Sequence, residues 1–254
     1  MKKITKTILT IAAAVTALSA ASCKKDDTLR YNNGTMGNVV NGTFTSDQGN
    51  IFNVVEQTCI GKLDTMKRAF VICDVLNQVG NGNEYDVRLN YISNVLTKDA
   101  VYSSSITEGN ELVNDPIILN SYWVAGGYIN IHLSVPIVSN SNVKHYINFL
   151  YEDTDQTEGT YTFNIRHDGT GEVFNESNEG QIVLASAYAS VPVTSIIKED
   201  NAKIILKWLS HKITGNAVSL TESHEVTREI LYSKDTYQQI PAEARMTRSD
   251  LDIR

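Results

Sequence analysis

The residues of this chain that could bind a metal are its histidines, and they are far apart in the sequence. They are His132, His145, His167, His211 and His224. A zinc site needs three or four ligands that converge on one point, whereas each of these histidines falls in a separate predicted strand or turn. No pair has the spacing of a metal-binding motif. We therefore expect surface or turn histidines and no metal site.

One acidic stretch partly resembles a calcium-binding loop. Residues 153–159 read Asp-Thr-Asp-Gln-Thr-Glu-Gly. They lack the third acidic ligand, the central glycine and the distal glutamate with which such a loop holds the ion. The sequence favours an acidic turn between two strands.

Motifs for nucleophilic and nucleotide chemistry are absent from the sequence. It contains no G-x-S-x-G elbow, no P-loop and no dinucleotide-binding glycine pattern. Trp123, Trp208 and the twelve tyrosines could line a sugar or peptide groove, although core packing is the commoner role of strand aromatics. We expect a protein that acts by binding, without catalytic activity or a cofactor.

The first 23 residues have the layout of an export signal. A basic start is followed by an apolar run over residues 8–18, which is shorter than the roughly 20 residues that span a bilayer as a helix. Small residues at 20–22 precede Cys23, and this pattern resembles the bacterial lipoprotein signal, in which the cysteine is lipidated. The alternative is an ordinary cleavage site with an incidental cysteine. Lipidation would anchor the protein to a membrane.

Charged residues directly follow that cysteine. Lys24, Lys25, Asp26 and Asp27 resemble the surface-export signal of Bacteroidetes lipoproteins. A plain solvated charge run is the alternative. We expect an outer-membrane lipoprotein displayed at the cell surface, with the periplasm-facing leaflet as the alternative, and a tether over residues 23–34.

Two further covalent modifications are suggested by short patterns. Thr28 and Thr65 each stand between an aspartate and an aliphatic residue, which resembles the Bacteroidetes O-glycosylation pattern. Cys59 and Cys73 are the only cysteines after Cys23, and an oxidising compartment would permit a disulfide between them. Two partly buried thiols in neighbouring strands are the alternative.

The charge balance bears on the class of partner. The formal net charge is −7, and loss of the three leader lysines would leave −10. An acidic body repels phosphate backbones, so we do not expect a nucleic-acid partner. Hydrophobic residues make up 42% of the chain, which is too much for a disordered protein.

The second half of the chain predicts strands that alternate with period two. In residues 128–135 the apolar side chains occupy every second position, as half-buried strands require. Residues 160–166 repeat the pattern. Further candidates are residues 143–151, 181–193 and 202–212. Strands spaced in this way predict an antiparallel β-sandwich over residues 108–234.

The first half predicts shorter and more closely spaced strands. The candidates are residues 36–45, 51–57, 68–76 and 84–96. They suit a small closed barrel of the OB type over residues 35–107. The polar segment 108–115 before Pro116 marks the boundary, and residues 235–254 read as a charged C-terminal tail, frayed or weakly helical.

Several stretches together resemble one family. They are residues 92–99, 114–117, 126–130, 144–148 and 165–167, with Trp123, and in this order they resemble NigD-like proteins of Bacteroidetes. The resemblance implies an OB-like barrel followed by a β-sandwich in an envelope lipoprotein. Because the family is associated with bacteriocin gene clusters, it also implies an accessory or immunity-like role.

Two alternative functions remain open at this point. One is a surface module that binds a glycan or a peptide, and the other is a fimbria-like structural subunit that adds a terminal strand to a neighbour's sheet. The expected partners are the membrane, through the lipid anchor, and a peptide, glycan or envelope protein. The tail after Lys234 departs from the family pattern.

Overall fold

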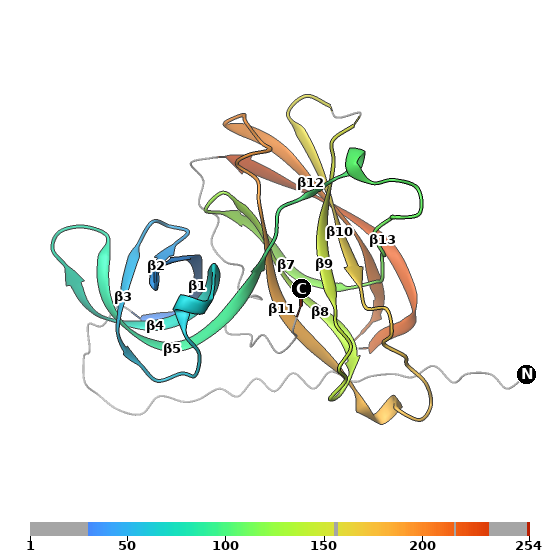
Figure 1. Cartoon of the computed structure of the whole chain (residues 1–254), viewed down its shortest axis with the longest axis horizontal. Coiled ribbons are helices and arrows are strands. Elements are labelled where there is room, and N and C mark those ends of the chain that lie inside the picture. The colour runs from blue at the N-terminus through green and yellow to red at the C-terminus, as the bar shows by residue number, and fades with distance from the viewer. Residues whose placement is uncertain (1–29, 155–156, 216, 234–252) are drawn as a thin grey trace, which may run out of the picture.

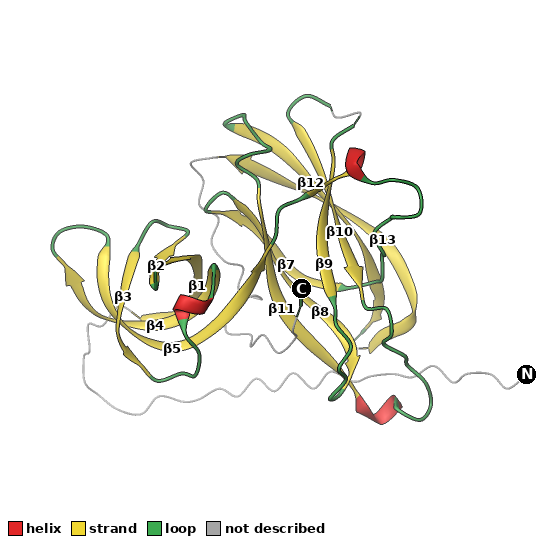
Figure 2. Cartoon of the chain, in the orientation of Figure 1, coloured by secondary structure: helices red, strands yellow, loops and turns green. Residues whose placement is uncertain are grey.

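The computed structural model describes residues 30–154, 157–215, 217–233 and 253–254. This part of the chain is built of strands, with three single 3₁₀ turns at Leu63–Thr65, Ser103–Ser105 and Glu179–Gln181 (Figures 1 and 2). None of its helical turns is long and apolar enough to cross a membrane. The predicted all-β class, with a barrel followed by a sandwich, is confirmed.

The N-terminal strands form a small closed barrel. They are β1 (Arg30–Val40), β2 (Thr43–Ser46), β3 (Ile51–Gln57), β4 (Arg68–Val79) and β5 (Glu84–Thr97). Their order is β3-β2-β1-β4-β5, and parallel pairing between β3 and β5 closes the barrel. Asn41 and Gly42 join β1 to β2 with φ angles of 50° and 80°, because a two-residue hairpin turn needs the left-handed region at both positions.

The C-terminal strands form two packed layers. They are β6 (Val101–Tyr102), β7 (Ile118–Ala125), β8 (Tyr128–Val138), β9 (Tyr146–Glu152), β10 (Thr160–Asp168), β11 (Ile182–Pro192), β12 (Asn201–Thr214) and β13 (Ala217–Ser233). One layer contains β11, β8 and β7; the other is a five-stranded sheet in the order β13-β12-β10-β9-β6. The alternating apolar residues of β8 and β10 fill the core between them, as predicted. The sandwich is not purely antiparallel, because β10 pairs with β12 and β6 with β9 in parallel.

A single sheet runs from the barrel into the sandwich. Strand β5 is long enough to close the barrel with one end and to pair with β11 with the other, through Val95–Thr97 against Tyr188–Ser190. Eight strands therefore belong to one hydrogen-bonded sheet, and Figure 1 shows β5 reaching from one half to the other. The two halves are joined by backbone pairing as well as by the connecting chain.

Three boundaries differ from those expected from the sequence. Strand β1 already begins at Arg30, within the expected tether of residues 23–34. Strand β6 pairs with β9 of the sandwich, although it lies within the expected barrel range of 35–107. Ile253, in the expected tail, forms a parallel bridge with His145. Each of these segments is too short or too polar to show period two, and each is fixed by a partner distant in sequence.

Candidate functional site

The most densely connected polar group lies between the barrel and the sandwich. Arg68, the first residue of β4, is 0% exposed. Its guanidinium donates two hydrogen bonds to Asp47, at 2.8 and 2.5 Å. Further partners are Asn38 at 3.0 Å, Ser190 at 3.1 Å, Asn130 at 3.0 Å and the ring of Tyr128 at 4.1 Å. The partners come from both halves, so this arginine holds the two halves together.

Burial of this ion pair shifts the pKa of its carboxyl group. Burial raises the pKa of Asp47, and the charge and hydrogen bonds of Arg68 oppose the shift without cancelling it. The desolvation of the carboxylate thus outweighs its attraction to the arginine, as is common for buried ion pairs. The polar face of β8 lies at the same junction, where Asn130 and His132 are 0% and 2% exposed.

Four of the five histidines are buried, which corrects the expectation of surface or turn positions. They are His132, His145, His167 and His211. His145 Nδ1 and His167 Nε2 are 3.0 Å apart, and the two rings stack with 5.3 Å between their centroids. His145 Nε2 lies 3.5 Å from a carboxylate oxygen of Glu172. The fold therefore gathers residues that lie far apart in the sequence.

The histidine pair lies where β10 and β12 separate. The backbone N–H of Asp115 donates to the carbonyl of His167, and Ile117 bridges to Ser210 of β12, so this segment fills the gap. Burial lowers the pKa of His167 to about 4, with a further contribution from His145 and opposition from Asp115. The His167 ring is thus neutral at neutral pH. Burial also lowers the pKa of His211.

The hydrogen-bond order around the pair does not produce an activated nucleophile. The hydroxyl of Ser141 donates to Glu172 at 2.8 Å, so the chain of contacts runs serine, glutamate, histidine, histidine. A hydrolytic triad needs the hydroxyl on the imidazole instead. Within the described ranges, no group of three His, Cys, Asp or Glu side chains is placed to hold a metal ion.

The two barrel cysteines are free thiols, which corrects the suggested disulfide. Cys73 lies on β4 and Cys59 follows β3, and β5 pairs with both strands and stands between them. Two strand spacings of about 4.8 Å each exceed the roughly 7 Å that the Cα atoms of a disulfide tolerate. The thiols are therefore not in neighbouring strands.

The remaining predicted positions have separate locations. Thr65 is exposed, and its hydroxyl donates to the carbonyl of Lys62 at 2.8 Å. Asp153 accepts hydrogen bonds from Ser103 and Ser104, which lower its pKa to about 2. It lies between β9 and β10, in a segment of which residues 155 and 156 lie outside the described part of the chain. Trp123 and Trp208 pack in the core at 2% and 8% exposure, as expected.

The predicted anchor and export residues lie outside the described part of the chain. They are Cys23, Lys24, Lys25, Asp26, Asp27 and the glycosylation candidate Thr28. The functional residues that sequence reasoning missed are Arg68 and the histidine pair. An arginine that starts the apolar run Ala69-Phe70-Val71 was the one available signal.

Comparison with known families fits this architecture. Residues 101–221, which begin at β6, match the NigD-like C-terminal β-sandwich domain. The match identifies the C-terminal half of the chain as a NigD-like β-sandwich domain. A comparison with curated proteins gives no match.

Solved structures share the fold of this chain over most of its length. A NigD-like immunity protein from Bacteroides caccae is 16% identical, with a TM-score of 0.53 over 85% of this chain and 100% of that chain. A candidate lipoprotein from Bacteroides fragilis is 13% identical, with a TM-score of 0.57 over 80% and 99%. A protein of unknown function from Bacteroides vulgatus is 15% identical, with a TM-score of 0.56 over 83% and 95%. At these identities the likeness concerns the fold alone.

Proposed function

We propose that this NigD-like protein is held at the outer membrane by a lipid on Cys23 and acts there by binding, in an immunity-like role against a bacteriocin. The binding role rests on one observation: the buried polar side chains that could do chemistry are engaged in structural contacts. Arg68 holds the two halves together, and Ser141 bonds a carboxylate rather than an imidazole.

The anchor rests on the leader and on the start of the fold. Strand β1 begins at Arg30, so six residues lie between it and Cys23, and the two Cα atoms are seven steps apart. At about 3.4 Å per residue this segment reaches at most roughly 24 Å, which would hold the barrel close to the membrane. Lys25, Asp26 and Asp27 would act as the surface-export signal.

The immunity-like role is transferred from the family. The solved relative from Bacteroides caccae is named as a NigD-like immunity protein, and the bacteriocin association of the family points the same way. A fimbria-like subunit is disfavoured, because the backbone of Arg254 is hydrogen-bonded within its own chain. Its carbonyl accepts from Ile147 of β9, and its N–H donates to the carbonyl of His145, just before β9.

A protection assay tests this proposal. A strain without the gene is complemented with the parent or with Cys23→Ala, and each strain is exposed to bacteriocins of related bacteria. We expect the parent to restore survival and Cys23→Ala to fail at equal abundance. Survival that does not depend on the gene contradicts the immunity-like role, and equal protection by both forms contradicts the need for an anchor.

A further inference from the structure

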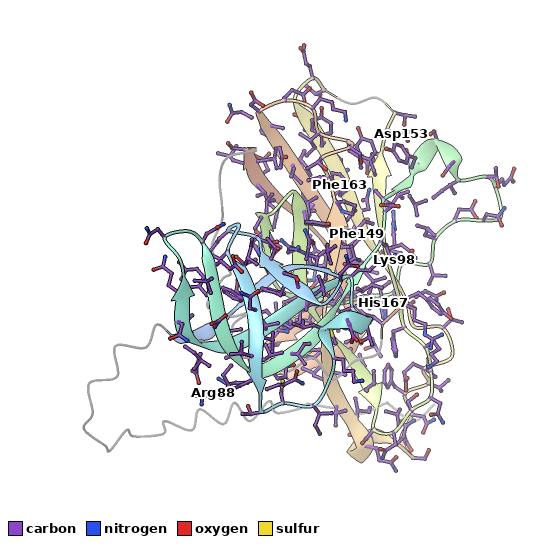
Figure 3. The ribbon with its side chains drawn as sticks, turned by 60° about the vertical axis from the view of Figure 1, so that its left-hand side comes forward. Arg88, Lys98, Phe149, Asp153, Phe163 and His167 are labelled. Atoms are coloured by element: carbon purple, nitrogen blue, oxygen red, sulfur yellow. The ribbon has the colours of Figure 1, made fainter. Side chains whose placement is uncertain are left out.

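Two cations meet on the outer face of the five-stranded sheet. Lys98 lies between β5 and β6, and its ammonium donates to the side-chain oxygen of Asn148 on β9 at 2.6 Å. Arg166 on β10 stands directly opposite Asn148 in the antiparallel register. Side chains of such a pair start about 5 Å apart, so the three polar groups share one patch. Figure 3 labels Lys98, and it labels Phe149 and His167 on the two strands that carry Asn148 and Arg166.

Neither cation is paired with a carboxylate among the described residues. Lys98 has Asn148 as its hydrogen-bond partner, and the Nε atom of Arg166 is buried without one. Two lysines on the same sheet face behave differently. Lys203 pairs with Glu229 at 3.3 Å and Lys207 pairs with Glu152 at 3.2 Å. The patch of Lys98, Asn148 and Arg166 thus lacks the counter-charge that its neighbours have.

The lack of a carboxylate partner makes the partial burial of these cations unfavourable. A partly buried cation without an anion loses hydration that a neutral amide replaces only in part, and burial lowers the pKa of Lys98. A carboxylate is the complementary group, because the planar guanidinium can donate two parallel hydrogen bonds to it. The body is acidic overall, at −7, so this attraction would be confined to the patch.

An aromatic side chain extends the same patch. Tyr146 precedes Asn148 by two residues on β9, which places both on one face of the sheet, and Tyr146 is 41% exposed. An exposed tyrosine offers an apolar ring face with a polar tip. A ligand with a carboxylate next to a ring that has one apolar face would satisfy the cations and cover this tyrosine. Acidic saccharides have this composition.

We propose that Lys98, Asn148 and Arg166 bind the carboxylate of an acidic saccharide, with Tyr146 packing against the sugar ring. The site goes beyond the immunity-like role proposed above, because it adds an acidic saccharide as a second class of ligand. Lys98 and Arg166 hold the carboxylate, and the amide of Asn148 positions the ammonium.

Calorimetric titration of the protein without its leader tests the site. The probes are a galacturonate oligomer and a sialylated oligosaccharide, each against its neutral counterpart, at low salt because exposed charges are screened. We expect the parent to bind at least one acidic probe and neither neutral one. Lys98→Gln and Arg166→Gln should each weaken binding about tenfold or more, as loss of a charged hydrogen bond does. Lys203→Gln, the matched control on the same face, should bind like the parent.

Several results would overturn the site. One is failure of both acidic probes to bind at millimolar concentration, and another is equal binding of a neutral counterpart. If Lys203→Gln loses as much affinity for the acidic probe as Lys98→Gln and Arg166→Gln do, binding reflects the overall charge of the sheet face and not this site. Binding of a glutamate-rich peptide without binding of either saccharide would overturn the ligand class. Thermal melts confirm that the variants fold. The protection assay with Cys23→Ala does not involve this patch, so failure of one proposal is distinguishable from failure of the other.

Discussion

Removing Asp47 should destabilise the whole molecule far more than removing a surface partner of another arginine. Arg68 is 0% exposed and Asp47 3% exposed, so Asp47→Ala leaves a buried guanidinium without its anion. Loss of one member of a buried pair costs about 3–5 kcal/mol. For a domain of this size each kcal/mol lowers Tm by roughly 2–4 °C, and the expected decrease is about 6–20 °C.

The matched control is Glu56→Ala, which removes the carboxylate 3.5 Å from Arg88. Both side chains of that pair are exposed, at 39% and 56%, and exposed ion pairs contribute little to stability. Urea unfolding of the leaderless protein, followed by circular dichroism, gives both free-energy differences. If Asp47→Ala and Glu56→Ala lose the same stability, Arg68 does not hold the two halves together in the way described.

Three other predictions follow from the described residues. The unfolded chain protonates His167 near its ordinary pKa of 6.5, whereas the folded chain does so at about 4. The free energy of unfolding should therefore fall by about 3 kcal/mol as pH drops from the unfolded to the folded pKa of His167. Urea midpoints measured against pH should change less in His167→Gln than in the parent, whereas His224→Gln should follow the parent. Equal pH dependence in His167→Gln and the parent would contradict the role given to His167. Burial raises the pKa of Cys73 to about 12, so maleimide should label Cys59 in the native leaderless protein and reach Cys73 only in urea. Failure of both thiols to react in urea would indicate a disulfide, and labelling of both in the native protein would contradict the burial of Cys73. Because β5 and β11 pair across the two halves, a protease cut within residues 106–115 should leave both fragments associated in gel filtration, and free separation would contradict the shared sheet.

Local pattern predicted much of this fold, because the pattern reports burial along a single strand. Strand β3 has the expected bounds Ile51–Gln57, and β10 begins at Thr160, where the predicted alternation begins. Alternation in β8 correctly placed Ile129 and Leu133 in the core.

Contacts between distant segments could not be predicted in the same way. The two-residue strand β6 is too short to have a period and is recognised only by its pairing with β9. Nothing near Arg68 in the sequence indicates Asn130 or Ser190, which lie 62 and 122 residues away. His145 and His167 meet because β9 and β10 are adjacent, so their contact depends on strand order rather than on spacing.

Acyl labelling of Cys23 tests the central claim most directly. Cells that express the parent or Cys23→Ala are grown with an alkyne fatty acid, and the protein is followed through membrane fractionation. The proposed anchor predicts that the parent is labelled and remains with the outer membrane, whereas Cys23→Ala is unlabelled and leaves the membrane fraction. An unlabelled parent, or a Cys23→Ala protein that stays with the membrane as the parent does, would contradict it.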